Sequence, residues 1–412
     1  MSNTSPSSLS DPVDQPQASS ARRLTALDSV RGVAAFAVLL HHCYLTFPDA
    51  PREHLDTFLW ARPLRLFING QASVIIFFLL SGYVLALPFF RGTQPSYLRY
   101  AFKRVCRIYI PFAIAISISV FLCASNPVRE SFAGAGGWLN FQGYGGVTLT
   151  PSMIARHFFM TGTNNSLDPV MWSLVYEMRI SLVFPLLMIL CRDTRVALLA
   201  AAVMLVGSTK ILVALGQSGP WGSNFWITFL WTVRMIPYFI IGILLSKHAD
   251  NIHQCIQHVP EQMRIAIIAV PIIIFTIPHS YLYNRMDVLY DIGAATVIVM
   301  ALEIPSVSAM LNRSVLQWLG RISYSLYLIH TPILYVTFYA LLGRVPFLFI
   351  VLTVIAISLG MATLMYRFVE VPAIKLGQRI ARVRPITSTP SLDNDQDDPK
   401  PALESLGGQT RI

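Results

Sequence analysis

Residues 24–47 read LTALDSVRGVAAFAVLLHHCYLTF, an apolar run that is long enough to enter a lipid bilayer. The run opens with the letters TALD, a pattern typical of helix starts. At about 100° per residue, Asp28, Arg31 and His42 share one narrow stripe of this helix, and His41 points about 80° away from it. Helical rise places His42 about 16 Å beyond Arg31, near the middle of a ~30 Å hydrocarbon core. Because charged groups facing lipid are costly, the stripe is predicted to face protein or a water-filled cavity.

The composition is that of a membrane protein. The 412 residues are 54% hydrophobic, with a mean hydropathy of +0.56. The apolar runs are continuous rather than alternating, which indicates helices and excludes a β-barrel. The formal charge of +10 is explained by basic residues in short loops facing the membrane surface, so no nucleic-acid partner is expected. Five scattered cysteines contain no C-x-x-C, and adjacent His41 and His42 diverge on a helix, so no metal site is predicted.

We therefore expect an all-α polytopic integral membrane protein with about ten transmembrane helices. Lys and Arg are concentrated in the loops that would share a side with both termini, which predicts that both termini are cytoplasmic. The spans are expected near residues 29–48, 73–90, 107–124, 172–191, 196–215, 225–246, 264–278, 287–304, 317–342 and 346–368.

Three segments are predicted along the chain. Residues 1–23 form a polar, disordered tail without the pattern of a cleaved signal peptide. Residues 24–372 form the transmembrane domain. Residues 373–412 are basic and then rich in Pro, Ser and Asp, and are expected to be a disordered cytoplasmic tail.

Several polar residues fall inside or beside the predicted spans. Arg104 and Arg107 lie one helical turn apart at the level of Arg31, where three guanidinium groups suit a polyanion such as phosphate. The alternative is that they are ordinary positive-inside anchors. Ser81 and Gly82 are expected near mid-bilayer. Small residues there permit close helix packing, or else Gly82 makes room for a ligand and Ser81 offers a hydroxyl.

A carboxylate and a histidine in later spans have two interpretations each. Glu177 lies about two turns into its span, which favours a functional role, or it forms a structural bridge with Arg234 or Lys210. His330 shares its span with Tyr324 and is also expected near mid-depth. A histidine there serves chemistry or simply hydrogen-bonds a neighbouring helix.

Together these residues resemble the membrane-bound acyltransferase-3 family, which includes O-antigen and exopolysaccharide O-acetyltransferases. The family's pattern of a basic residue, ten residues and a histidine is met by Arg31 and His42. Its FFxxSG pattern is met by residues 77–82, and its RxxR pattern by Arg104 and Arg107. The later W-S-L-x-x-E and G-x-x-S-Y-x-x-Y-L-x-H stretches also look like the family. The chain resembles the stand-alone form, without the SGNH domain of some members.

The resemblance implies a reaction and a location. An acyl group, commonly acetyl, would pass from an acyl-CoA co-substrate to a hydroxyl of a carbohydrate or glycolipid acceptor. The acceptor would belong to a surface glycan such as a lipopolysaccharide or exopolysaccharide. The protein would be a multi-pass component of the cell inner (cytoplasmic) membrane. Direct transfer and a covalent acyl-histidine intermediate both stay open.

The resemblance and the helical geometry together give each candidate residue a role. His42 is expected to act as general base and Glu177 to position the acceptor in the catalytic centre. The expected acyl-CoA contacts are Arg31, Arg104, Arg107 and Ser81. The supporting residues are Asp28, Gly82, Tyr324 and His330.

Two other functions fit part of the pattern. A transporter or flippase for a glycan or glycolipid would also carry charges inside the membrane. A membrane scaffold would use the polar stripe only to pack helices. Neither explains an arginine-lined mouth together with a mid-depth histidine, and consumption of acyl-CoA would separate acyl transfer from both.

Overall fold

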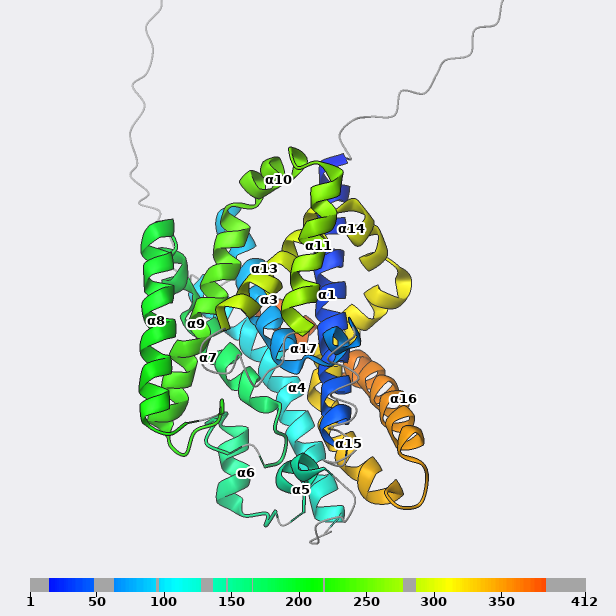
Figure 1. Ribbon diagram of the computed structural model, residues 1–412. Coiled ribbons are helices and arrows are strands. Elements are labelled where there is room, and N and C mark those ends of the chain that lie inside the picture. The colour runs from blue at the N-terminus through cyan, green and yellow to red at the C-terminus, as the bar shows by residue number, and fades with distance from the viewer. Residues whose placement is uncertain are drawn as a thin grey trace, which may run out of the picture.

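The computed structural model describes residues 15–47, 63–93, 96–126, 136–145, 147–164, 166–217, 219–276 and 287–382. These residues are all helical or in short connections, which confirms the predicted all-α class. The helices are α1 (Gln15–Leu45), η2 (Pro63–Ile68), α3 (Gly70–Phe90), α4 (Tyr97–Ser125), α5 (Gly137–Gln142), α6 (Pro151–Phe158), α7 (Met171–Leu190), α8 (Thr194–Ala214), α9 (Phe225–Lys247), α10 (Ala249–Gln257), α11 (Glu261–Thr276), α13 (Asp287–Glu303), α14 (Pro305–Leu311), α15 (Ser314–Leu341), α16 (Phe347–Met365), η3 (Tyr366–Glu370) and α17 (Val371–Arg382). Figure 1 shows how they form one bundle, with α5 and α6 at the end opposite α10.

Among the described residues, seven helices are long and apolar enough to cross a membrane. An eighth is reached if α13 and α14, which meet at a bend of 89°, count as one broken span. This confirms a multi-pass membrane protein but not the expected count of ten. Helix α11 has only 16 residues, and α15 is long but carries a polar stripe that lowers its hydropathy.

The helix bounds also refine the two predicted tails. Helix α1 begins at Gln15, inside the segment expected to be a disordered tail. Helix α17 extends to Arg382, so the first part of the predicted C-terminal tail is an amphipathic helix packed against α4. Residues 1–14 and 383–412, where the rest of those predictions falls, lie outside the described residues.

Two helix pairs form the centre of the bundle, α1 with α15 and α3 with α9. Both pairs approach closely at glycines. A Cβ atom built on Gly32 of α1 would lie 2.4 Å from the backbone nitrogen of Gly320 on α15. A Cβ atom on Gly242 of α9 would lie 2.1 Å from the carbonyl oxygen of Leu79 on α3. Small residues at these crossings let the backbones touch, as is common between helices in membranes.

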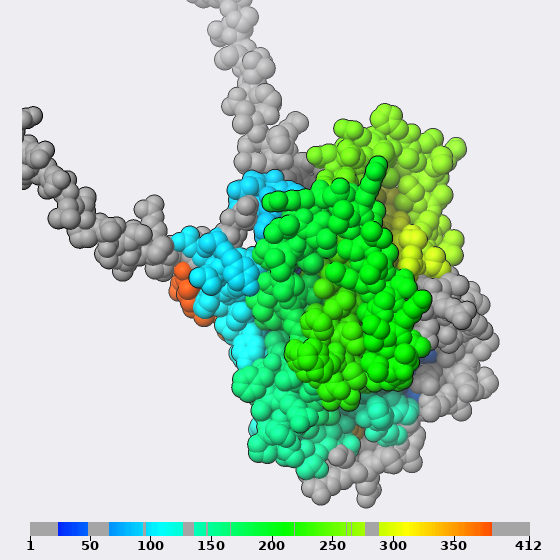
Figure 2. All heavy atoms as spheres, turned by 90° about the vertical axis from the view of Figure 1, so that its left-hand side faces the viewer, coloured from blue at the N-terminus to red at the C-terminus, as the bar shows by residue number. Residues whose placement is uncertain are grey.

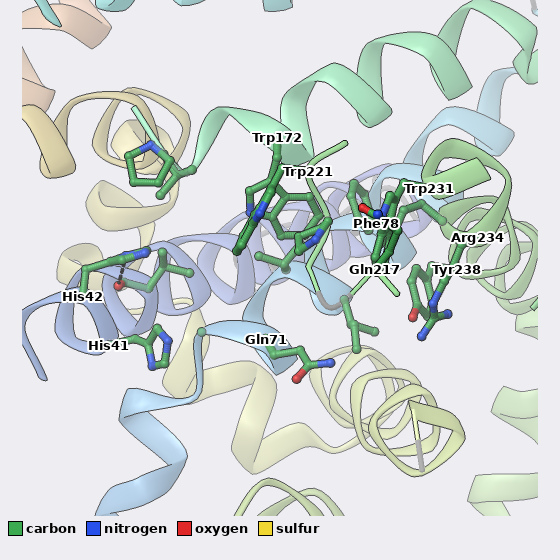
Figure 3. Close-up of a pocket in the computed structure, with 18 of the residues that line it drawn as sticks. His41, His42, Gln71, Phe78, Trp172, Gln217, Trp221, Trp231, Arg234 and Tyr238 are labelled. Atoms are coloured by element: carbon green, nitrogen blue, oxygen red, sulfur yellow. Dashed lines mark hydrogen bonds between the residues drawn. The ribbon is translucent and has the colours of Figure 1, made fainter. Parts of the chain in front are cut away.

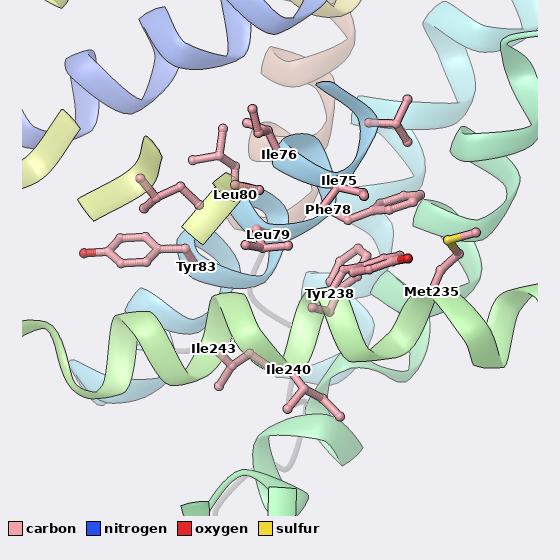
Figure 4. Close-up of a cluster of buried hydrophobic side chains, with 14 of the residues drawn as sticks. Ile75, Ile76, Phe78, Leu79, Leu80, Tyr83, Met235, Tyr238, Ile240 and Ile243 are labelled. Atoms are coloured by element: carbon pink, nitrogen blue, oxygen red, sulfur yellow. The ribbon is translucent and has the colours of Figure 1, made fainter. Parts of the chain in front are cut away.

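The apolar core between α3 and α9 is shown in Figure 4. The rings of Phe78 and Tyr238 lie face to face there, 6.1 Å apart between centroids and 5° apart in plane. Leu79, Leu80 and Ile240 are also fully or almost fully buried in this cluster. The tight packing of α3 against α9 therefore fixes the positions of the side chains that these helices carry.

Helix α8 lies at the edge of the bundle and covers much of the face seen in Figure 2. Only 22% of its most apolar window is buried. Its outward side chains are aliphatic, among them Leu199 and Val203, with exposures of 67% and 63%. An exposed aliphatic helix of this length fits contact with lipid.

Candidate active site

The larger of two neighbouring cavities has a volume of about 320 Å³. Its wall is formed mainly by α1, α3, α7, α8 and α9, with the short helix α5 at one side. Figure 3 shows His42 and Arg234 toward opposite ends, with Trp172 and Trp221 between them. The lining also includes tryptophans and carboxamides contributed by Trp138, Trp231, Gln71, Gln142 and Gln217. A concave site with aromatic walls and a few polar groups is typical of a small-molecule or sugar pocket.

The smaller cavity, of about 60 Å³, collects most of the polar residues predicted from the sequence. They come from α1, α3, α4, α7 and α15, so the fold brings together positions that lie far apart in the chain. The lining includes Arg31, Ser81, Arg104, Arg107, Glu177 and Tyr324. Three guanidinium groups face one carboxylate among these side chains, which gives the cavity an excess of positive charge.

Contacts inside the smaller cavity fix several of these side chains. The Ser81 hydroxyl donates to Oε1 of Glu177 over 2.9 Å, which links α3 to α7. Glu177 is therefore bonded to a serine, while Arg234, one suggested bridge partner, lines the larger cavity. The Tyr324 hydroxyl donates to the carbonyl oxygen of Ile108 over 2.7 Å, which ties α15 to α4 beside the arginines.

Asp28 stands at the edge of this group. Its Oδ1 atom lies 3.7 Å from a terminal nitrogen of Arg31, one turn along α1. The Asp28 side chain is 59% exposed, whereas that of Arg31 is only 19% exposed. Asp28 is thus placed to orient Arg31, and it does not line either cavity.

Gly82 does not line either cavity. A Cβ atom on it would lie 2.3 Å from the carbonyl oxygen of Phe239. Gly82 therefore serves the close approach of α3 to α9, while the adjacent Ser81 faces the smaller cavity. Of the two interpretations given for this pair, close helix packing applies to Gly82, and a hydroxyl offered to a cavity applies to Ser81.

His42 contacts His330 across the α1–α15 interface. Nε2 of His330 lies 3.1 Å from Nδ1 of His42, and the ring centroids are 5.1 Å apart. Nδ1 of His42 also lies 2.9 Å from the carbonyl oxygen of Val38, and Nδ1 of His330 lies 3.0 Å from that of Leu326. His330 is completely buried.

These contacts define the tautomers of the two rings. A carbonyl oxygen only accepts, so Nδ1 of His330 carries the proton and donates to Leu326. Nε2 of a neutral His330 then accepts, and Nδ1 of His42 must donate to it and to Val38. In a neutral His42 the remaining ring nitrogen, Nε2, then carries a lone pair. The His42 side chain lines the larger cavity.

The neighbouring His41 is held differently, although it also lines the larger cavity. Its Nδ1 lies 2.8 Å from the carbonyl oxygen of Ile68 in η2. The His41 ring packs directly against Gly70, because a Cβ atom built on Gly70 would lie only 2.6 Å from that ring. These contacts join α1 to the start of α3, which is a structural role.

Two ionisable residues, the half-buried Arg179 and the fully buried Asp168, were not identified from the sequence. Arg179 donates to the Thr161 carbonyl over 2.8 Å and to Thr228 and Thr232 over 3.2 Å, and so ties α7 to α9 and to the segment after α6. Asp168, just before α7, accepts from Thr331 and from the Val170 backbone. The only signal in the sequence was that both flank the W-S-L-x-x-E stretch, because Thr331, Thr228 and Thr232 lie far away in the chain.

Asp168 is fully buried outside the candidate spans. Burial raises the pKa of its carboxyl from 3.8 to about 8, although the hydrogen bonds from Thr331 and Val170 act in the opposite direction. Thr331 follows His330, so Asp168 fixes the segment of α15 that presents His330 to His42.

Fold and site together describe a multi-pass helical membrane protein with an arginine-lined cavity beside a histidine-bearing one. Residues 24–367 match the acyltransferase-3 family, described as an acyltransferase domain, and the chain belongs to this family. It is also similar to the O-acetyltransferase PaAT-1 of Phomopsis amygdali, with 33% identity over 113 residues. That match covers 24% of this chain and 21% of the relative. No solved structure matches the chain. The family and this relative support an O-acyltransferase activity in the membrane.

Proposed function

We propose that the protein transfers an acyl group, in the simplest case acetyl, from acyl-CoA to a hydroxyl of a carbohydrate or glycolipid, with His42 as general base. The observation that supports this proposal is the His42–His330 contact at the wall of the larger cavity, in which a neutral His42 donates from Nδ1 and keeps Nε2 as the basic nitrogen. General-base help of this kind is typically worth ~10²–10⁴ in rate.

The donor is assigned to the smaller cavity. Arg31, Arg104 and Arg107 offer guanidinium forks that suit the phosphates of CoA. Asp28 orients Arg31, and Glu177 holds Ser81 at the wall of the same cavity. Arg31 and His42 are about 16 Å apart by helical rise, a distance that the long pantetheine arm of CoA can span with its thioester.

The acceptor is assigned to the larger cavity. Tryptophan faces can pack on the apolar face of a sugar ring, and the carboxamides of Gln71, Gln142 and Gln217 can bind its hydroxyls. Glu177 lies with the arginines on the donor side, so in this proposal it supports the donor site rather than the acceptor. We place the protein in the cell inner membrane, with both termini and the arginine-lined cavity toward the cytoplasm.

The chemical step is an acyl transfer with one proton moved. The acceptor oxygen attacks the thioester carbonyl while Nε2 of His42 takes the hydroxyl proton. The C–O bond forms, the C–S bond breaks, and the CoA thiolate takes the proton back from His42. The imidazolium formed in between is stabilised because its Nδ1–H already donates to Val38 and His330. In the covalent alternative, the same Nε2 attacks the carbonyl first.

The test is release of CoA thiol from acetyl-CoA by the detergent-purified full chain, with p-nitrophenyl glycosides as acceptors. We expect His42→Ala to lower kcat by ~10²–10⁴. The control is His258→Ala, because His258 is the exposed C-cap of α10 and lines neither cavity. The two variants must unfold at the same temperature as the wild type.

Each outcome bears on the proposal. Loss of turnover in His42→Ala with retained turnover in His258→Ala supports His42 as the base. Normal turnover in His42→Ala contradicts its role. A wild type that consumes no acyl-CoA with any glycoside or glycolipid acceptor favours the transport alternative.

A further inference from the structure

Three side chains line both cavities: Val74 and Phe78 of α3, and Tyr327 of α15. We refer to them as the partition. Val74 and Phe78 are four residues apart and so share one face of α3. Val74, Phe78 and Tyr327 are 7%, 2% and 4% exposed, respectively, so the partition is enclosed by protein on its other sides.

Aromatic contacts hold Phe78 in place. Its ring stacks on that of Tyr238 (Figure 4). The ring of Phe239 lies 5.7 Å away, measured between centroids. On the side of the larger cavity, the ring of Trp172 is 6.5 Å away (Figure 3). A ring packed against three others cannot move far without opening a void.

Tyr327 is fixed by its hydroxyl group. That hydroxyl lies 2.7 Å from Oγ of Ser173 and donates to the carbonyl oxygen of Val170 over 3.1 Å. The ring also meets Phe77 edge-on at 5.5 Å. Val74 is β-branched and therefore stiff at its first side-chain torsion. The partition thus consists of two anchored rings and one stiff aliphatic side chain.

This arrangement limits what can pass between the cavities. If the arginines hold the donor phosphates and His42 stands at the other cavity, as the proposed function has it, the acyl end of the donor must cross the partition first. We infer that the donor's arm passes between Val74, Phe78 and Tyr327, and that these side chains select acyl groups by width, admitting unbranched chains and rejecting branched ones.

The selection follows from cross-sections. An unbranched acyl chain is no wider than the linear part of the arm that follows it, so it needs no extra room. A branch next to the carbonyl adds a methyl group to the width, and a tightly packed wall accommodates an extra methyl group poorly. One carbon more or less at such a site commonly changes kcat/KM by about 10–200-fold.

The test compares two donors of equal carbon number, n-butyryl-CoA and isobutyryl-CoA, beside acetyl-CoA. It measures thiol release by the full chain in lipid nanodiscs. We expect the wild type to use the unbranched donor with a kcat/KM at least about tenfold higher. Val74→Ala widens the partition and should reduce that preference about tenfold. Phe78→Leu is a second variant, which keeps the inference testable if the first folds poorly.

The matched control is Val84→Ala. It makes the same substitution on the same helix, and Val84 lines neither cavity. It should leave the ratio between the two donors unchanged.

Two results overturn the inference while leaving acyl transfer intact. One is a wild type that turns over acetyl-CoA and uses both four-carbon donors equally. The other is a donor ratio that stays the same in Val74→Ala and Phe78→Leu, which would mean that the donor reaches His42 by another route. A wild type that is inert with acetyl-CoA, whatever the acceptor, removes the proposed function itself and this inference with it.

Discussion

Nε2 of His330 lies 3.1 Å from Nδ1 of His42, although 288 residues separate the two histidines in the chain. The contact holds the His42 ring by its Nδ1 side, and the proposed mechanism assigns Nε2 to the substrate. His330 lines neither of the two cavities described, so in the proposed mechanism it acts on the reaction only through His42. In that mechanism His330 is a positioning residue, comparable to the third member of a catalytic triad, with a neutral acceptor where a triad has a carboxylate.

The first prediction concerns His330. His330→Ala removes the acceptor for Nδ1–H of His42, so the ring loses a fixed orientation and kcat should fall by about 10²-fold with little change in the KM for acyl-CoA. His330→Gln offers a side-chain oxygen that can still accept, and should recover part of the rate. Steady-state kinetics on purified protein measures both parameters.

A purely structural His330 would behave differently. It would lower the unfolding temperature in both variants and reduce the amount of active protein rather than kcat per active site. Equal losses of kcat in the Ala and Gln variants would count against the positioning role, because only Gln can replace the acceptor.

The second prediction concerns the donor site. Arg104→Ala removes one guanidinium from the smaller cavity and should raise the KM for acyl-CoA about tenfold or more, with a smaller effect on kcat. Lys103→Ala is the matched control, because Lys103 precedes Arg104 on α4, is exposed and lines neither cavity. An equal rise in both variants would mean that the arginine acts only through general surface charge.

The sequence predicted the central helices well because the bilayer constrains them strongly. The runs expected at 73–90 and 172–191 match α3 and α7 within about three residues at either end. The length of an apolar run follows from the thickness of the hydrocarbon core, so such runs can be identified without knowing their partners. The expected count of ten was not confirmed, because α11 has only 16 residues, α13 and α14 meet at a bend of 89°, and polar side chains lower the hydropathy of α15, the helix predicted at 317–342.

The sequence could name candidate residues one by one, but it could not predict how they are arranged in space. Helical periodicity placed Arg31 and His42 on one stripe, and the structure assigns them to two cavities on either side of the partition. The sequence could not show this division, since Val74, Phe78 and Tyr327 come from other helices. Nor could it pair His42 with His330, because that contact depends on how α1 packs against α15.

The third prediction concerns the contact of α3 with α9. Gly82→Ala would place a methyl group 2.3 Å from the Phe239 carbonyl oxygen, so the helices must separate. We expect a loss of about 1–3 kcal/mol in the free energy of unfolding, seen as a lower unfolding temperature in detergent. The shift should also disturb Ser81 and weaken acyl-CoA binding.

Gly207→Ala on α8 is the control for this change. A Cβ atom there meets nothing within 4 Å, and alanine is the better helix former by ~0.5–1 kcal/mol. It should be neutral or slightly stabilising. Similar destabilisation by both substitutions would show that α3 and α9 do not need their close contact at Gly82.

The fourth prediction is a pH dependence carried by Asp168. Its pKa is about 8 in the folded protein and 3.8 ordinarily, so between these values the folded state holds a proton that the unfolded state has lost. The contribution of Asp168 to the free energy of unfolding is therefore fully present below about pH 4, and it declines as the pH rises toward about 8. Asp168→Asn cannot ionise, so it should gain stability relative to the wild type between pH 5 and 9, by a few kcal/mol.

Unfolding temperatures of the two proteins in detergent across this pH range test the prediction, with Asp193→Asn as the control. Asp193 is an exposed N-cap of α8, and asparagine caps a helix equally well, so this change should alter stability little. Because Thr331 bonds Asp168 and follows His330, ionised Asp168 should also loosen the His330–His42 contact. If the difference in unfolding temperature between Asp168→Asn and the wild type is the same at pH 5 and pH 9, Asp168 does not titrate in this range. Its ionisation then cannot affect the His330–His42 contact.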